Sequence, residues 1–296
     1  MRSLARILFV LGTLVAVVPA YAENADAHYK QGLAYKQQGK ADEAIASLEK
    51  AVAANPKHGM AWSSLGNLYK AKGDIPKAVN AYEMATAVIK KDKVLWANLG
   101  MAYYRADKID KALEALITAS KLAPKDAEIR GNLGTVRRKK GDTAGAIVDL
   151  EMATQLKPDD ANYWNNLGVA YRTAKRDDDA IKAYQKAVAL SPNDASFHFN
   201  LAVTYRRKEM VDEAIASYEK AVGLDPANAE GWFDLGFMYK TDHQNDKAIE
   251  AFNKYIEINK GKDPAGAKRV EDELGSLGAT PKKDPKKVPK PVPKKK

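Results

Sequence analysis

Three stretches of the chain share one pattern: residues 62–69 read WSSLGNLY, residues 96–103 read WANLGMAY, and residues 164–171 read WNNLGVAY. The first two stretches start 34 residues apart, at 62 and 96. The third starts at 164, which is 102 residues, or three times 34, after the first, so all three fit a period of 34 residues. In each stretch the first, fourth, fifth and eighth places fall on one face of a helix. A pattern that recurs at a fixed period indicates a repeat architecture, in which each unit buries its apolar face against its neighbours.

The period continues without insertion on both sides of these stretches. We number the positions of each 34-residue unit from Ala25, which is position 1 of the first unit. Position 4 then holds all four tryptophans, position 8 is glycine in six units, and position 11 is tyrosine in six. Position 20 is alanine in all seven units, and position 32 is proline in five. We therefore predict seven units, at residues 25–58, 59–92, 93–126, 127–160, 161–194, 195–228 and 229–262.

Each unit is expected to contain two helices, with positions 4, 7, 8 and 11 on one and positions 20, 24 and 27 on the other. Small residues at positions 8 and 20 let the two backbones approach closely, and proline at position 32 ends the second helix. After the seventh unit, Asp263 and Pro264 are typical of a helix start. We predict a capping helix within residues 263–279 that covers the open end of the array.

These columns resemble the tetratricopeptide repeat, and the resemblance covers residues 25–262. It implies antiparallel helix pairs stacked into a right-handed superhelix with a concave groove. The expected fold class is therefore all-α, an α-solenoid with a C-terminal capping helix.

The segment 1–22 has the plan of a secretory signal peptide. Arg2 and Arg6 form a positively charged start, and an apolar run follows from Ile7 to Val18. Ala20-Tyr21-Ala22 then has the small–x–small pattern of a cleavage site. We expect cleavage after Ala22, which would place the mature protein in a periplasm or outside the cell. An uncleaved anchor helix is the alternative, but the apolar run is shorter than the roughly 20 residues that a membrane span needs.

The C-terminal segment 280–296 reads TPKKDPKKVPKPVPKKK and has almost no apolar surface to bury. We predict a disordered tail with polyproline II character. The chain has 296 residues and a formal net charge of +10. Ten of its 48 cationic residues and one of its 38 anionic residues lie in the two ends, so the segment between them has a net charge of about +1. The overall charge therefore does not predict that the folded part binds nucleic acid.

The sequence contains no motif that points to catalysis. The absence of cysteine excludes thiol chemistry and cysteine-bound metals. The four histidines are far apart, and there is no phosphate-binding glycine loop, GxSxG or HExxH. We therefore expect a protein that is not an enzyme, with no cofactor and no metal site.

The unit at residues 127–160 departs from the pattern, since Arg130 and Arg137 replace tryptophan and tyrosine at positions 4 and 11. We expect both arginines to lay their aliphatic stems across the core and keep their charged heads in water. A functional role is the alternative. The loss of two large aromatic side chains predicts that this unit is the least stable in the array.

A ladder of asparagines is expected to line the groove. Position 6 lies on the predicted inner face of the first helix and holds Asn98, Asn132, Asn166 and Asn200 in four consecutive units. Asparagine is a mediocre helix former, and its amide suits bidentate pairing with an extended peptide backbone. The alternative is that the column only records duplication of one unit.

Cations and aromatic residues accompany this ladder. Positions 12 and 13 supply Arg105, Arg138, Lys139, Arg172, Arg206 and Arg207. The helix dipole explains one cation at a helix end, but doubled cations favour an acidic ligand. Positions 5 and 9 supply Phe199, Phe233 and Phe237, which predict an apolar pocket for a side chain of the ligand.

Two functions of different classes follow. The first is an exported, non-catalytic scaffold that holds an extended, acidic segment of a partner protein in its groove. The second is a polyanion-binding protein whose Lys/Pro-rich tail attaches to an anionic envelope polymer or membrane surface. A tail that only aids solubility is the third possibility. The sequence predicts no oligomeric state, and we do not expect nucleic acid as the partner.

Overall fold

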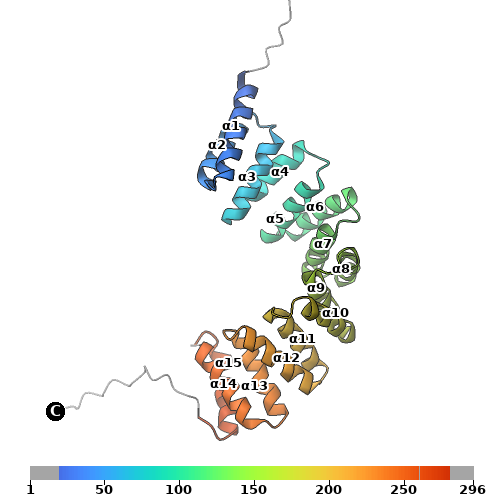
Figure 1. The fold of residues 1–296 in the computed structure, drawn as a ribbon, viewed down its shortest axis with the longest axis vertical. Helices are drawn as coiled ribbons and strands as arrows, with labels where there is room; N and C mark the ends of the chain where they lie inside the picture. The colour runs from blue at the N-terminus through green and yellow to red at the C-terminus, as the bar shows by residue number, and fades with distance from the viewer. Residues whose placement is uncertain (1–19, 260, 281–296) are drawn as a thin grey trace, which may run out of the picture. The chain divides into compact units, whose positions relative to one another are not determined.

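The computed structural model describes residues 20–259 and 261–280, and its regular structure is entirely helical (Figure 1). The chain divides into two compact units, one ending at Ala123 and the other beginning at Pro124. The all-α fold class predicted from the sequence is confirmed, as a helical-repeat solenoid. None of the helices in the described ranges is long and apolar enough to cross a membrane.

The first unit contains three antiparallel helix pairs. Their bounds are α1 Ala20–Gln37, α2 Ala41–Ala54, α3 Gly59–Lys72, α4 Ile75–Val88, α5 Lys93–Arg105 and α6 Ile109–Leu122. Each helix packs against the next along the chain, so that α2 joins the first pair to α3 and α4 joins the second pair to α5.

The second unit contains four helix pairs and one further helix, with each helix again packed against the next. Their bounds are α7 Ala127–Lys140, α8 Thr143–Leu156, α9 Ala161–Thr173, α10 Asp177–Leu190, α11 Ala195–Arg207, α12 Val211–Leu224, α13 Ala229–Thr241, α14 Asn245–Asn259 and α15 Pro264–Ser276. The last helix, α15, begins after the N-cap Asp263 and packs on α14 through the buried Val270 and Leu274.

The two ends of the chain fall mostly outside the described residues. This holds for residues 1–19 of the expected signal peptide and for residues 281–296 of the expected tail. The helix α1 begins at Ala20, so the last three residues of the expected leader belong to its first turn. The signal peptide and the disordered tail stay predictions.

Most of the first helices of the pairs begin with a side-chain N-cap. Asp92, Asp126, Asp160 and Asp194 each accept a hydrogen bond from a backbone N–H in the first turn of the helix that follows. Such a cap is worth about 1 kcal/mol, because it satisfies an N–H that has no partner inside the helix.

The turn inside each helix pair has one left-handed residue, always at position 15 of the period. Glycine takes this conformation at Gly39, Gly73 and Gly141. The remaining four turns place non-glycine residues there, with φ between 56° and 60°, at Asp107, Lys175, Glu209 and His243. The turn geometry is therefore kept even where the side chain opposes it.

Close approach of the two helices in a pair depends on the small residue at position 8. A Cβ atom added to Gly168 would lie 2.6 Å from the ring of Tyr184 in α10, and one added to Gly236 would lie 2.5 Å from the ring of Phe252 in α14. Both rings are fully buried. The glycine thus leaves room for a ring of the partner helix, as the column of small residues predicted.

Position 4 supplies an N–H donor as well as packing. The indole Nε1 of Trp62 donates to the carbonyl of Pro56 at 2.9 Å, and the other three tryptophans donate to the carbonyl six residues earlier in the same way. His198 takes the same place, with Nε2 2.9 Å from the carbonyl of Pro192, and Arg130 donates from Nε to the carbonyl of Pro124 at 3.0 Å. The contact survives the change of side chain.

Position 11 links neighbouring pairs within each unit. The tyrosine hydroxyl donates to a glutamate twenty residues earlier, at 2.5 Å for Tyr69–Glu49 and Tyr103–Glu83 and also for Tyr171–Glu151 and Tyr239–Glu219. Tyr205 instead accepts from the Gln185 amide at 2.9 Å. Burial and the neighbouring carboxylate raise the pKa of Tyr171 to about 12.

The pair α7–α8 replaces these aromatic contacts with a buried ion cluster. The Arg130 guanidinium donates to Asp149 Oδ1 at 2.8 Å, and Arg137 NH1 lies 3.0 Å from Asp149 Oδ2. Asp149 is 1% exposed and occupies position 23, where the other six helix pairs have alanine or serine. The expectation that both charged heads stay in water was wrong, because a buried carboxylate binds both of them.

Replacement of Asp149 by alanine should destabilise the protein. Removing one member of a buried ion pair costs about 3–5 kcal/mol, and we expect about 2–3 kcal/mol because the two arginine side chains are 23% and 26% exposed. The triple variant R130W/R137Y/D149A restores the residue types found elsewhere and should regain most of this loss. Chemical denaturation measures both values.

The matched control is Ser47→Ala, which makes the same kind of change at position 23 of another pair. Its expected effect is below about 1 kcal/mol. If Asp149→Ala were as mild as this control, the ion cluster would contribute nothing to stability.

Candidate functional site

In the first unit, two of the predicted groove residues come from α5. The Asn98 side chain is half-buried, and its Oδ1 accepts a hydrogen bond from Lys70 Nζ of α3 at 3.0 Å. Arg105, in the last turn of α5, is exposed. The asparagine amide is therefore partly engaged by a cation of the preceding helix pair.

In the second unit, the remaining groove residues lie on the first helices of four successive pairs. Asn132, Arg138 and Lys139 belong to α7, Asn166 and Arg172 to α9, Phe199, Asn200, Arg206 and Arg207 to α11, and Phe233 and Phe237 to α13. The three asparagines are half-buried rather than fully exposed.

Cations at position 12 contact position 6 of the next pair along the chain. Arg172 NH2 lies 3.5 Å from Asn200 Oδ1, and Arg206 NH1 lies 2.8 Å from Asp234 Oδ1. The Lys70–Asn98 contact in the first unit follows the same rule. Within the second unit, the two columns that the sequence treated separately thus form a ladder of one cation–amide and one cation–carboxylate contact.

Not every cation of the ladder is neutralised. Arg207 pairs with Asp177 at 3.3 Å and donates to the backbone carbonyl of Arg172 at 3.2 Å. Arg138 is half-buried, and its guanidinium makes no hydrogen bond or ion pair with any residue of the described ranges. Positive charge therefore remains near α7 and α9.

The three predicted aromatic residues do not gather into one pocket. Phe233 and Phe237 contact each other, with ring centroids 4.9 Å apart, and the guanidinium of Arg269 in α15 lies 4.3 Å from the Phe237 ring. Phe199 instead contacts Tyr218 at 5.8 Å. The apolar anchor expected over α11 and α13 is therefore partly covered by the chain's own last helix.

Asp234 is a carboxylate that sequence reasoning did not single out. It is 4% exposed, and besides Arg206 it accepts a hydrogen bond from the Tyr218 hydroxyl at 2.9 Å. Burial raises the pKa of Asp234 above its usual range, and this effect outweighs the favourable contacts with Arg206 and Tyr218. The sequence did contain a signal for this residue, because Asp234 occupies position 6, which is asparagine in four other helix pairs.

The tyrosines at position 24 find different partners. The hydroxyl of Tyr82 donates to Asn67 at 2.8 Å, and that of Tyr218 donates to Asp234. The Tyr184 hydroxyl is buried and has no hydrogen-bond partner among the described residues. Burial raises the pKa of Tyr184 to about 12, although nearby arginines oppose the shift.

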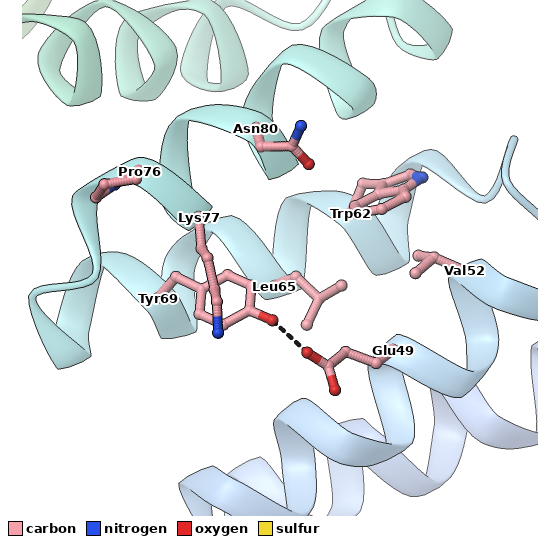
Figure 2. A pocket seen from close by; sticks show the side chains of 8 residues that line it. All are labelled: Glu49, Val52, Trp62, Leu65, Tyr69, Pro76, Lys77 and Asn80. Atoms are coloured by element: carbon pink, nitrogen blue, oxygen red, sulfur yellow. Dashed lines mark hydrogen bonds between the residues drawn. The ribbon is translucent and has the colours of Figure 1, made fainter. Parts of the chain in front are cut away.

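A pocket of about 400 Å³ lies on another part of the first unit (Figure 2). The side chains around it come from α2, α3 and α4, and the Tyr69–Glu49 hydrogen bond forms part of its wall. Lys77 Nζ lies 5.3 Å from the centre of the Tyr69 ring. The glutamate column, twenty residues before the tyrosines, could have pointed to this pocket.

The described residues contain no group of three or more histidine, aspartate or glutamate side chains that could hold a metal ion. His58 caps α3, since its Nδ1 accepts from the N–H of Ala61, and His198 is buried in the tryptophan position. These two histidines therefore have structural partners.

A titration of Asp234 would test its unusual environment. A carboxyl with a raised folded-state pKa holds its proton to higher pH than in the unfolded chain, where its value is near 3.8. Its contribution to the unfolding free energy is therefore present below that value and is lost as the pH rises through the raised pKa. NMR titration of the carboxyl carbon measures the folded value.

The variant Asp234→Asn is the control for this titration, because it removes the ionisable group and keeps the shape. Between about pH 3 and the raised pKa, the wild type should lose stability relative to this variant as the pH rises. A folded-state value below 3.8 would contradict the expected direction.

Two family models match the chain. The model of the cilia and flagella-associated protein 70 C-terminal domain matches residues 11–231, and the tetratricopeptide repeat model matches residues 199–266. Among curated protein sequences, none matches the chain.

Solved structures share the fold. A chain of the APC/C hetero-tetramer Cut9–Hcn1 is 29% identical with a TM-score of 0.56, over 71% of this chain and 42% of that one. A tetratricopeptide repeat protein from Parabacteroides merdae is 17% identical with a TM-score of 0.63, over 86% and 98%. The protein YrrB is 22% identical with a TM-score of 0.55, over 66% and 100%.

This chain therefore spans about two fifths of the Cut9–Hcn1 chain that it matches, and nearly all of the other two. The first family model matches about three quarters of the chain. The chain belongs to the tetratricopeptide repeat family, in the group described by the C-terminal domain of cilia and flagella-associated protein 70.

Proposed function

We propose that this protein is a non-catalytic scaffold that binds an extended, acidic peptide segment of a partner protein. The observation that carries the proposal is the ladder of cations and amides along α7, α9 and α11, in which Arg138 has no partner among the described residues and Arg172 only a long contact to Asn200. An acidic segment supplies the carboxylates that this ladder lacks.

The comparisons support the peptide-binding part of this proposal by likeness of fold. YrrB is described as a TPR protein with an unusual peptide-binding site. In the present chain, asparagine amides offer donors and acceptors to a peptide backbone, and arginines offer charge-assisted bonds to acidic side chains. Backbone pairing of this kind favours extended peptides and specifies little of their sequence.

Export from the cell forms part of the same proposal. It rests on the three-part pattern of residues 1–22. Within the envelope, the protein would hold a partner segment while the Lys/Pro-rich tail attaches to an anionic surface. Mass spectrometry of the mature N-terminus tests the processing, and a chain beginning at Glu23 is the expected result.

Substitution of the ladder should weaken peptide binding. The triple variant N132A/N166A/N200A removes three amides, each worth about 0.5–1.5 kcal/mol when it pairs with a peptide backbone. We expect at least a tenfold loss of affinity for a fluorescein-labelled peptide of alternating glutamate and serine. Fluorescence anisotropy measures the affinity, and circular dichroism checks that the variant remains helical.

The second candidate function, polyanion binding by the tail, predicts a different result. A chain ending at Ala279 lacks the Lys/Pro-rich segment, and we expect it to bind the acidic peptide as the full chain does. If binding instead followed the tail and fell steeply with added salt, the polyanion function would replace the groove function.

A further inference from the structure

Two neighbouring junctions of the second unit share their geometry but differ in charge. At the junction of α11–α12 with α13, the Asp234 carboxylate lies between Arg206, at 2.8 Å, and the Tyr218 hydroxyl, at 2.9 Å. Arginine and tyrosine come from positions 12 and 24 of one pair, and aspartate comes from position 6 of the next. Every polar group of this trio has a partner.

The preceding junction, of α9–α10 with α11, has the same arginine and tyrosine but no carboxylate. Arg172 and Tyr184 occupy positions 12 and 24, and Asn200 occupies position 6. Arg172 reaches Asn200 only at 3.5 Å, the long limit of a hydrogen bond. The Tyr184 hydroxyl is buried and donates to nothing in the described ranges.

A buried hydroxyl without a partner is costly, and other position-24 tyrosines avoid that cost. Tyr82 donates to Asn67 at position 9 of its own pair, and Tyr218 donates to Asp234. The residue at position 9 in the pair of Tyr184 is Val169, which has no acceptor in its side chain. Tyr184 therefore has a donor ready for an acceptor from outside.

The surroundings of Tyr184 favour an anionic acceptor. The Arg172 guanidinium lies 5.8 Å from the centre of its ring, and Arg138 on α7 has no ion-pair partner in the described ranges. Asp177 on α10 offsets one further cation by its contact with Arg207. The balance of these side chains is positive.

We propose that Arg172 and Tyr184 form a carboxylate subsite beside Asn200, in which an aspartate or glutamate of a bound peptide pairs with them as Asp234 pairs with Arg206 and Tyr218 one helix pair further on. The Arg172 guanidinium is able to turn to the ligand because its contact with Asn200 Oδ1 is long, and Asn200 itself stays in place through the bond from its Nδ2 to Asn165 Oδ1 at 3.0 Å. The ligand carboxylate then accepts from the Arg172 guanidinium and from the Tyr184 hydroxyl.

This subsite deepens the proposed function, on which it rests, by giving the groove a position where it reads charge. The junction with Asp234 is already neutralised by the chain itself. Acidic side chains of the peptide are therefore selected over α9–α11 and gain nothing over α13. Selection at a single place sets the register of the peptide along the helices.

The variant Asn200→Asp tests the subsite by building its occupant into the chain. We expect a Tm close to that of the wild type, because the contacts of the new carboxylate with Arg172 and Tyr184 offset the cost of burying it. We also expect about a tenfold loss of affinity for the labelled glutamate–serine peptide. Asn193→Asp adds the same charge in an exposed loop and should change neither value appreciably.

A second pair of variants separates the subsite from a general effect of charge. Tyr184→Phe removes a hydroxyl without a partner in the described ranges, so it should leave Tm unchanged or higher and still weaken binding of the glutamate peptide several-fold. Tyr218→Phe breaks the bond to Asp234, so it should lower Tm and leave binding nearly intact. The matching glutamine–serine peptide should show no difference between Tyr184→Phe and the wild type.

The outcomes distinguish the subsite from the function on which it rests. Binding of the glutamate peptide that is equal in wild type, N200D and Y184F overturns the subsite and leaves the scaffold function standing. An equal loss of binding in N193D and N200D also overturns it, in favour of net charge. Absence of binding to either peptide in the wild type overturns the proposed function, and with it the subsite that rests on that function.

Discussion

The close approach of two helix backbones in each pair is the constraint on which the rest of the structure depends. A small residue at position 8 leaves space that a large side chain at position 24 of the partner helix fills, as Gly168 does for Tyr184 and Gly236 for Phe252. Once the pair is closed in this way, its outer faces can be buried only against the next pair. Within each unit, the spacing of the first helices, and hence of the side chains along them, follows from this packing.

The pair α7–α8 shows that the constraint fixes volume and polar satisfaction rather than residue type. Arg130, Arg137 and Asp149 occupy positions that hold aromatic and small residues elsewhere. Their mutual pairing offsets three charges that would each be costly to bury alone. The three changes make physical sense only together, because either arginine or the aspartate alone would leave a charge without a partner.

Sequence periodicity predicted the fold well, because each column repeats a local requirement. The unit starts predicted at residues 59, 93, 127, 161, 195 and 229 coincide with the first residues of α3, α5, α7, α9, α11 and α13.

The candidate site was less predictable. Contacts such as Arg206–Asp234 join different columns of different pairs, and a search along single columns does not reveal them. The buried Asp149 was missed for the same reason. The stacking of Arg269 of α15 on Phe237 could not be predicted from the columns, because α15 lies outside the repeats.

The hydrogen bond made by position 4 decides what a side chain at this position must provide. Tryptophan, histidine and arginine share little in size or hydrophobicity, yet Trp62, His198 and Arg130 all place a ring or guanidinium nitrogen against the carbonyl six residues earlier. The contact at this position therefore depends on a nitrogen donor at a given reach and not on aromaticity. Phenylalanine, which matches tryptophan in aromatic character but has no donor, would leave this carbonyl without the bond.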